Sequence, residues 1–197
     1  MLELRNIAEV FTGVAFREVP DGCAKVVRLS DLSDLKAGRF PVLGRGVAPD
    51  VARALVIQEG DLLVGARGAT TDVSIASEAV FDAFVSLDLY LVRPNTAKVN
   101  PQYLASFLML PTTQAQLAGA KQGSRLSRLP KNALESMAIL LPPLEAQSLI
   151  AGLAVSLEEE DHLLKKLTHL NSILGREAIA RAIRAANMKQ VHKEHQQ

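Results

Sequence analysis

The sequence predicts an α/β (α+β) globular domain, with a twisted mixed sheet and short helices, followed by one long C-terminal helix. Short apolar runs separated by Gly, Asp and Pro fill the first half of the chain, and this pattern favours strands. The pattern changes at Val99, after which short helices are expected. From residue 142 apolar residues recur at steps of three and four, which predicts the long helix. Apolar residues make up 48% of the 197, so the front part can bury a core.

The first half of the chain predicts an alternation of turns and strands. Residues 1–20 contain a short amphipathic segment that stops near Gly13, and Asp21-Gly22 marks a turn. We expect a strand within residues 23–29, and then a loop, or a helical turn and a loop, over 30–46. Four short apolar runs predict further strands of a sheet that is buried on one or both faces: 54–57, 61–64, 73–76 and 87–92.

Two short helices and a basic loop are expected next. Asn100 is a suitable N-cap, and Pro101 fits the first helical position, where its missing N–H costs nothing. A second helix is expected from residue 111 to 118, with Gly119 ending it. Residues 121–128 form a basic loop, and residues 134–141 return to a strand-like composition.

The long helix is expected to cover residues 142–190, with a polar tail over 191–197, so the front domain spans 1–141. A helix of this length, about 70 Å at ~1.5 Å per residue, cannot bury its apolar stripe against so small a domain. It therefore needs a partner helix. Its seam for a coiled coil consists of Leu149, Leu153, Leu157, Leu163, Leu167, Leu170 and Leu174.

Composition excludes several classes of protein. No stretch is long and apolar enough for a membrane span, and the N-terminus lacks a signal peptide's pattern, so a cytoplasmic protein is expected. Cys23 is the single cysteine, which excludes a disulfide framework and a cysteine-based metal site. The net charge of +1 hides a local asymmetry. Residues 121–131 carry only basic charges, whereas 158–161 are all acidic, which suggests different partners for the two ends.

No segment carries a catalytic signature, so no enzymatic activity, metal or cofactor is expected. The glycine-rich segment 60–68 lacks the Gly-Lys-Ser/Thr ending of a phosphate-binding loop and the spacing of a dinucleotide fingerprint. Its glycines fit a structural turn or a loop that contacts a ligand. In the second case Arg67, between Ala66 and Gly68, would project unhindered.

Several sequence blocks, taken in order, resemble one family. They are 4–13 (LRNIAEVFTG), 60–64 (GDLLV) with Arg67-Gly68, 101–104 (PQYL) with Gln116-Leu117, Gly123-Ser124 with Leu129, and 140–147 (LLPPLEAQ) with Ile150-Ala151. This ordered set is similar to the target-recognition domain, and the start of the conserved helix, of specificity subunits of type I restriction–modification systems. The resemblance covers nearly the whole chain.

The resemblance implies a protein that recognises DNA sequence and has no enzymatic activity. A typical member carries two recognition domains and two long helices, which pair antiparallel and dock methyltransferase subunits. This chain has one of each and looks like half a subunit. We therefore expect a homodimer on a bipartite, inverted-repeat target. Its partners would be double-stranded DNA, the methyltransferase subunits and, through them, the restriction subunit, with no membrane.

Polar loops beside the predicted strands supply the candidate DNA contacts, because base edges need fixed donors and acceptors while Lys and Arg hold phosphates. Candidates for base or groove contact are Arg17, Arg39, Arg45, Arg67, Thr70 and Thr71. Candidates for phosphate contact are Lys121, Gln122, Ser124, Arg125 and Arg128.

An interaction adaptor that has the coiled coil but binds no DNA is the alternative. The near-zero net charge favours it, because many DNA-binding domains are distinctly basic. Salt-dependent binding to duplex DNA would separate the two interpretations.

Overall fold

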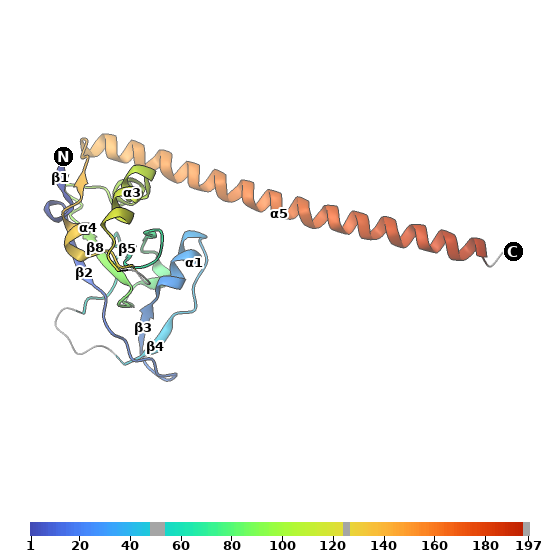
Figure 1. Ribbon diagram of the computed structural model, residues 1–197, viewed down its shortest axis with the longest axis horizontal. Helices are drawn as coiled ribbons and strands as arrows, with labels where there is room; N and C mark the ends of the chain where they lie inside the picture. The colour runs from blue at the N-terminus through green and yellow to red at the C-terminus, as the bar shows by residue number, and fades with distance from the viewer. Residues whose placement is uncertain (48–53, 124–126, 195–197) are drawn as a thin grey trace. The chain divides into compact units, whose positions relative to one another are not determined.

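The computed structural model describes residues 1–47, 54–123 and 127–194, and it describes side chains up to residue 184. The chain divides into two compact units, Met1–Ala154 and Val155–Gln197 (Figure 1). The first unit contains all the strands and short helices, and the second is helical as far as it is described.

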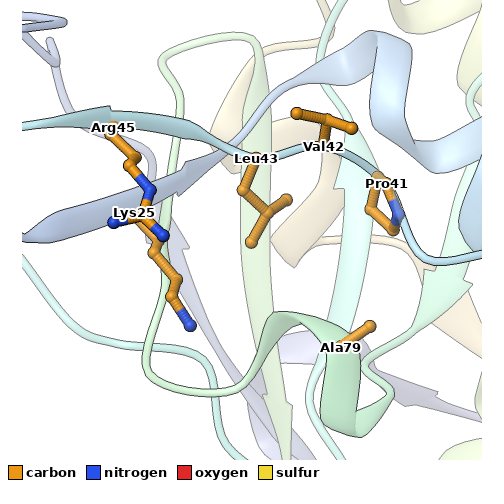
Figure 2. A pocket seen from close by; sticks show the side chains of 6 residues that line it. All are labelled: Lys25, Pro41, Val42, Leu43, Arg45 and Ala79. Atoms are coloured by element: carbon orange, nitrogen blue, oxygen red, sulfur yellow. The ribbon is translucent and has the colours of Figure 1, made fainter. Parts of the chain in front are cut away.

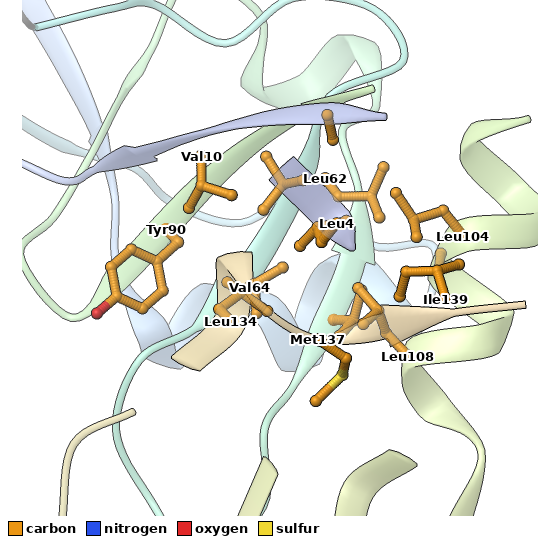
Figure 3. Close-up of a cluster of buried hydrophobic side chains, with 14 of the residues drawn as sticks. Leu4, Val10, Leu62, Val64, Tyr90, Leu104, Leu108, Leu134, Met137 and Ile139 are labelled. Carbon is orange, nitrogen blue, oxygen red and sulfur yellow. The ribbon is translucent and has the colours of Figure 1, made fainter. Parts of the chain in front are cut away.

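A four-stranded antiparallel sheet lies at the centre of the first unit. Its strands are β2 (Ala8–Thr12), β8 (Leu89–Pro94), β5 (Leu62–Gly65) and β6 (Val73–Ile75), in that order. Successive side chains of a strand point to opposite faces of the sheet, and both faces of β5 and β8 carry apolar residues. Leu62 and Val64 join one core with Tyr90 and Val92. Figure 3 shows Leu62, Val64 and Tyr90 in this core, together with Leu4, Leu104 and Ile139. Leu63, Leu89 and Leu91 join a second core on the opposite face.

Two smaller sheets complete the unit. In one, β3 (Ala24–Val27) lies between β4 (Gly44–Gly46), which is antiparallel to it, and β7 (Phe84–Val85), which is parallel. In the other, β1 (Leu2–Glu3) pairs antiparallel with β9 (Ala138–Ile139). The mixed strand directions and the short helices confirm the predicted fold class.

Two short helices, those from Pro101 and from Pro111, begin at the residues that the sequence predicts. The helices of the first half are η1 (Leu4–Asn6), η2 (Leu29–Asp31), α1 (Leu32–Lys36) and η3 (Glu78–Val80). They are followed by α2 (Pro101–Met109), α3 (Pro111–Ala120), α4 (Lys131–Glu135) and α5 (Leu144–Glu194). At the start of α2 the side-chain Oδ1 of Asn100 accepts hydrogen bonds from the backbone N–H groups of Gln102 and Tyr103, as an N-cap does.

Five predicted elements differ from the structure. The loop expected over 30–46 ends in strand β4, because Gly44–Gly46 pair with β3. The 54–57 run is not a strand, because Ile57 bonds its backbone N–H to the carbonyl of Ala83 and its carbonyl to the N–H of Asp82, outside any strand ladder. The amphipathic segment before Gly13 consists of η1 and then strand β2. Helix α3 runs past Gly119 to Ala120, and Leu134 lies in α4, so only Ala138–Ile139 of the 134–141 run is a strand.

The long helix predicted after Pro142-Pro143 is confirmed, but it begins at Leu144 rather than at residue 142 and continues past residue 190 to Glu194, into the expected polar tail. Its first turn packs into the first unit through Gln147, which is 1% exposed. The side chain of Gln147 accepts a hydrogen bond from the N–H of Asn100 and donates to the carbonyls of Pro142 and Lys98. In the part of the chain with described coordinates, no helix combines the length and apolarity that crossing a membrane requires.

Candidate nucleic-acid interface

Two loops that are far apart in the sequence lie side by side at one end of the central sheet. The first is 66–72, between β5 and β6, and the second is the described part of 121–129, after α3. The N–H of Leu129 donates to the carbonyl of Ala66 at 2.8 Å, and Arg67 and Arg128 form a backbone bridge. We call these segments the loop pair. It brings together two groups of candidate residues that are about 50 residues apart in the sequence.

Side chains from helix α3 and its C-cap hold the first loop in place. The amide side chain of Gln114 accepts from the N–H of Thr71 at 3.1 Å and donates to the carbonyl of Thr71 at 2.9 Å. Lys121 Nζ donates to the carbonyl of Gly68 at 2.8 Å. Burial lowers the pKa of Lys121, and the carboxylate of Asp72 opposes that shift. Lys121 therefore joins the two loops. Gln114 was not among the candidate residues named from the sequence, since nothing in the sequence distinguishes it from the exposed Gln116.

The two arginines of the loop pair are tied to neighbours. Arg67 Nε lies 2.5 Å from Asp88 Oδ1, although that contact is not aligned as a hydrogen bond. The guanidinium of Arg128 lies over the ring of Tyr90, 5.6 Å from its centroid. The expectation that Arg67 projects unhindered is wrong, because Asp88 holds its side chain. The left-handed φ of +98° at Gly68 shows that the glycine serves a turn.

The remaining candidates of the loop pair differ in exposure. Thr70 and Gln122 are exposed. Thr71 is 1% exposed and its hydroxyl has no partner, so the expectation that it lies on an accessible loop is wrong. The reason is its packing beneath Gln114, which pairs with both backbone groups of Thr71. Ser124 and Arg125 lie outside the described residues.

Three other predicted arginines lie away from the loop pair. Arg45 is on β4, and the backbone carbonyl of Arg17 accepts a hydrogen bond from Val47, just after that strand. Both side chains are exposed. Arg39 follows α1 and forms an ion pair with Asp34 at 2.5 Å. The candidates thus fall into separate groups, of which the loop pair is the largest.

Within the described residues, no three side chains of His, Cys, Asp or Glu come together as a metal site would require. The seam leucines of α5 are exposed, from 47% for Leu170 to 73% for Leu149. A row of exposed large apolar side chains along one helix is typical of a surface that binds a partner.

The family follows from a sequence profile. Residues 24–170 match the family described as type I restriction modification DNA specificity domain. The chain therefore belongs to that family. No protein of curated function matches it in sequence.

Solved structures show the same fold. The S subunit of a type I restriction–modification system from M. genitalium is 12% identical, with a TM-score of 0.55 over 80% of this chain and 38% of that one. The HsdS subunit from Thermoanaerobacter tengcongensis is 20% identical, with a TM-score of 0.60 over 84% of this chain and 43% of that one. This chain thus spans about two fifths of the length of these structures.

Proposed function

We propose that this chain recognises a DNA sequence as a specificity subunit of a type I restriction–modification system and is itself not an enzyme. The observation that carries the proposal is the family match over residues 24–170, which includes both loops of the loop pair. Duplex DNA is the partner that such loops suit, because a rigid sheet supports them and they carry the exposed polar side chains of Thr70 and Gln122.

Within the loop pair, the side chains have different proposed roles. Thr70 and Gln122 are exposed hydrogen-bonding groups and are the proposed base contacts. Arg128 presents a guanidinium that the Tyr90 ring keeps in place, which suits a phosphate. Lys121 shapes the loop, since its ammonium already binds loop carbonyls.

The long helix supports the second part of the proposal. We infer that residues 1–141 form the recognition domain and that 142–190 pair with the same helix of a second copy. Such an isologous pair would hold two recognition domains on a bipartite, inverted-repeat target. The helices would then determine the spacing between the half-sites and dock the methyltransferase subunits. The exposed leucine seam is the observation behind this inference.

The test is DNA binding by the full chain co-expressed with methyltransferase subunits of a type I system. Duplexes would be selected from a random pool, and the affinity for the selected duplex measured between about 50 and 200 mM salt. We expect one enriched bipartite sequence and a linear fall of log affinity with log salt concentration. Binding without sequence preference or salt dependence would overturn the proposal.

A protein-interaction adaptor is the second candidate. Its supporting observation is the charge balance: the net charge is +1, and Arg39 and Arg67 both lie against carboxylates. It predicts that the chain assembles through its helix and that no duplex binds at any salt concentration. The same titration therefore separates the two candidates.

A further inference from the structure

A second basic surface lies on the small sheet, away from the loop pair. Residues 17–19 pair with β4, since the N–H of Val19 donates to the carbonyl of Arg45 and that of Val47 donates to the carbonyl of Arg17. On its other side β4 pairs with β3, and Lys25 stands opposite Arg45. Side chains directly opposite each other share a face, and so do alternate residues of a strand. Arg17, Arg45 and Lys25 therefore lie on one face, which we call the basic ladder.

The acidic residue next to the basic ladder, Glu18, has its side chain on the opposite face of the small sheet. Glu18, between Arg17 and Val19, forms an ion pair with Arg28. On that face β4 has only glycines, because a Cβ at Gly44 would lie 2.6 Å from Arg28 Nη2 and one at Gly46 would lie 2.1 Å from the carbonyl oxygen of Arg17. The Gly-Arg-Gly sequence of β4 thus packs tightly on one side and presents Arg45 alone on the other.

Lys25 and Arg45 line a pocket whose described lining residues include no acidic side chain. Like charges directly opposite each other in a sheet repel. Within the described part of the chain, neither these two nor Arg17 forms an ion pair, whereas Arg28, Arg39, Arg67 and Arg93 all do. The pocket beside them has a volume of about 270 Å³, and Pro41, Val42, Leu43 and Ala79 complete its lining (Figure 2). Figure 2 shows the side chains of Lys25 and Arg45 side by side.

We propose that the basic ladder binds a phosphodiester of the DNA backbone, with Lys25 and Arg45 as the contacting side chains. This inference rests on the proposed function. A phosphate matches the pair because its anionic oxygens satisfy a guanidinium fork and an ammonium together, and this relieves the repulsion between the two. The contact adds affinity and carries no sequence information, because a phosphate is the same at every base pair.

Lys25 was not among the residues named from the sequence, although its polar position between Ala24 and Val26 marks it as outward-facing.

The test compares salt dependence of DNA binding for two double variants of the full chain with its methyltransferase subunits. Lys25→Gln/Arg45→Gln removes the proposed contacts. Arg5→Gln/Lys98→Gln is the matched control, since it removes the same charge from residues that contact Glu3 and the carbonyl of Asn6 instead. The plot of log affinity against log salt concentration has a negative slope, and loss of two phosphate contacts makes that slope shallower by about 1.8. We expect that change, with about a tenfold or greater loss of affinity at ~0.1 M salt, in the first variant and little change in the control.

Three results would overturn the inference while leaving DNA recognition intact. One is an unchanged slope in Lys25→Gln/Arg45→Gln, and another is an equal change in the control, which would indicate a net-charge effect. The third is a changed sequence preference at one position, which would indicate a base contact. If the unmodified complex binds no duplex, the proposed function itself fails. Thermal unfolding of both variants checks that a lost contact is not a lost fold.

Discussion

Asp61 and Arg93 form a two-pronged ion pair across the central sheet: Arg93 Nε and Nη2 donate to the two carboxylate oxygens of Asp61 at 2.8 Å. The Asp61 side chain is 2% exposed and also accepts the N–H of Gln58, and Arg93 donates further to the carbonyl of Val56. This pair raises the pKa of Arg93, chiefly through the hydrogen bonds to Asp61. The acidic residue of the GDLLV block therefore has a structural role.

Removing this pair should destabilise the fold. Asp61→Ala leaves Arg93 without its partner and frees the N–H of Gln58, so we expect a loss of about 3 kcal/mol in the free energy of unfolding. Urea denaturation of the full chain measures it. Asp34→Ala breaks the exposed pair with Arg39 and serves as the control, with an expected loss below about 1 kcal/mol. Equal losses in the two variants would contradict the argument.

Gln114 should control the conformation of the first recognition loop. Gln114→Ala removes the hydrogen bonds to both backbone groups of Thr71 and leaves those groups buried, so the loop should open more often. We expect hydrogen exchange at the Thr71 amide to quicken by about tenfold or more, in line with a loss of ~1.5 kcal/mol. Gln116→Ala, on the exposed side of the same helix, is the matched control. No difference between the two would show that Gln114 does not hold the loop.

Ionisation of Tyr103 should lower the free energy of unfolding at alkaline pH. Its hydroxyl donates to the carbonyl of Leu140 at 2.6 Å, and burial raises its pKa above the ordinary value of 10.0. The unfolded chain therefore releases this proton at a lower pH than the folded chain does. The stabilisation from Tyr103 is complete below pH 10.0 and declines above it. Tyr103→Phe should cost about 1 kcal/mol at pH 8, and unfolding measured above pH 10.0 should show a smaller difference. A difference that grows with pH would reverse the assigned direction.

The leucine seam should control the oligomeric state. Leu163→Lys/Leu170→Lys places two charges on the apolar stripe of α5, so the proposed helix pair should dissociate. Light scattering at tens of micromolar should give a dimer for the unmodified chain and a monomer for this variant. His169→Lys/Ser172→Lys adds the same charge on the opposite face of the helix and should remain dimeric. A monomeric unmodified chain would rule out the symmetric pair.

Patterns within a few adjacent residues, such as a helix cap, predicted the elements whose formation needs only those residues. Asn100-Pro101 defines a helix start because capping needs only the next few backbone N–H groups. The 61–64 run becomes a strand because it alternates between two cores. The 54–57 run has a similar composition but forms no strand, since Ile57 bonds to Asp82 and Ala83 outside a ladder. No local signal separates these two runs.

The sequence by itself determined the α+β class, the helix start at Asn100 and the long helix after Pro142-Pro143, because period and capping are properties of adjacent residues. Only the tertiary structure decided which cations are available to a partner. Arg67 is held by Asp88, Lys121 by the carbonyl of Gly68, and Lys25 stands beside Arg45. Each of these contacts joins segments that only folding brings together, and an ion pair depends on distance in space rather than on spacing along the chain.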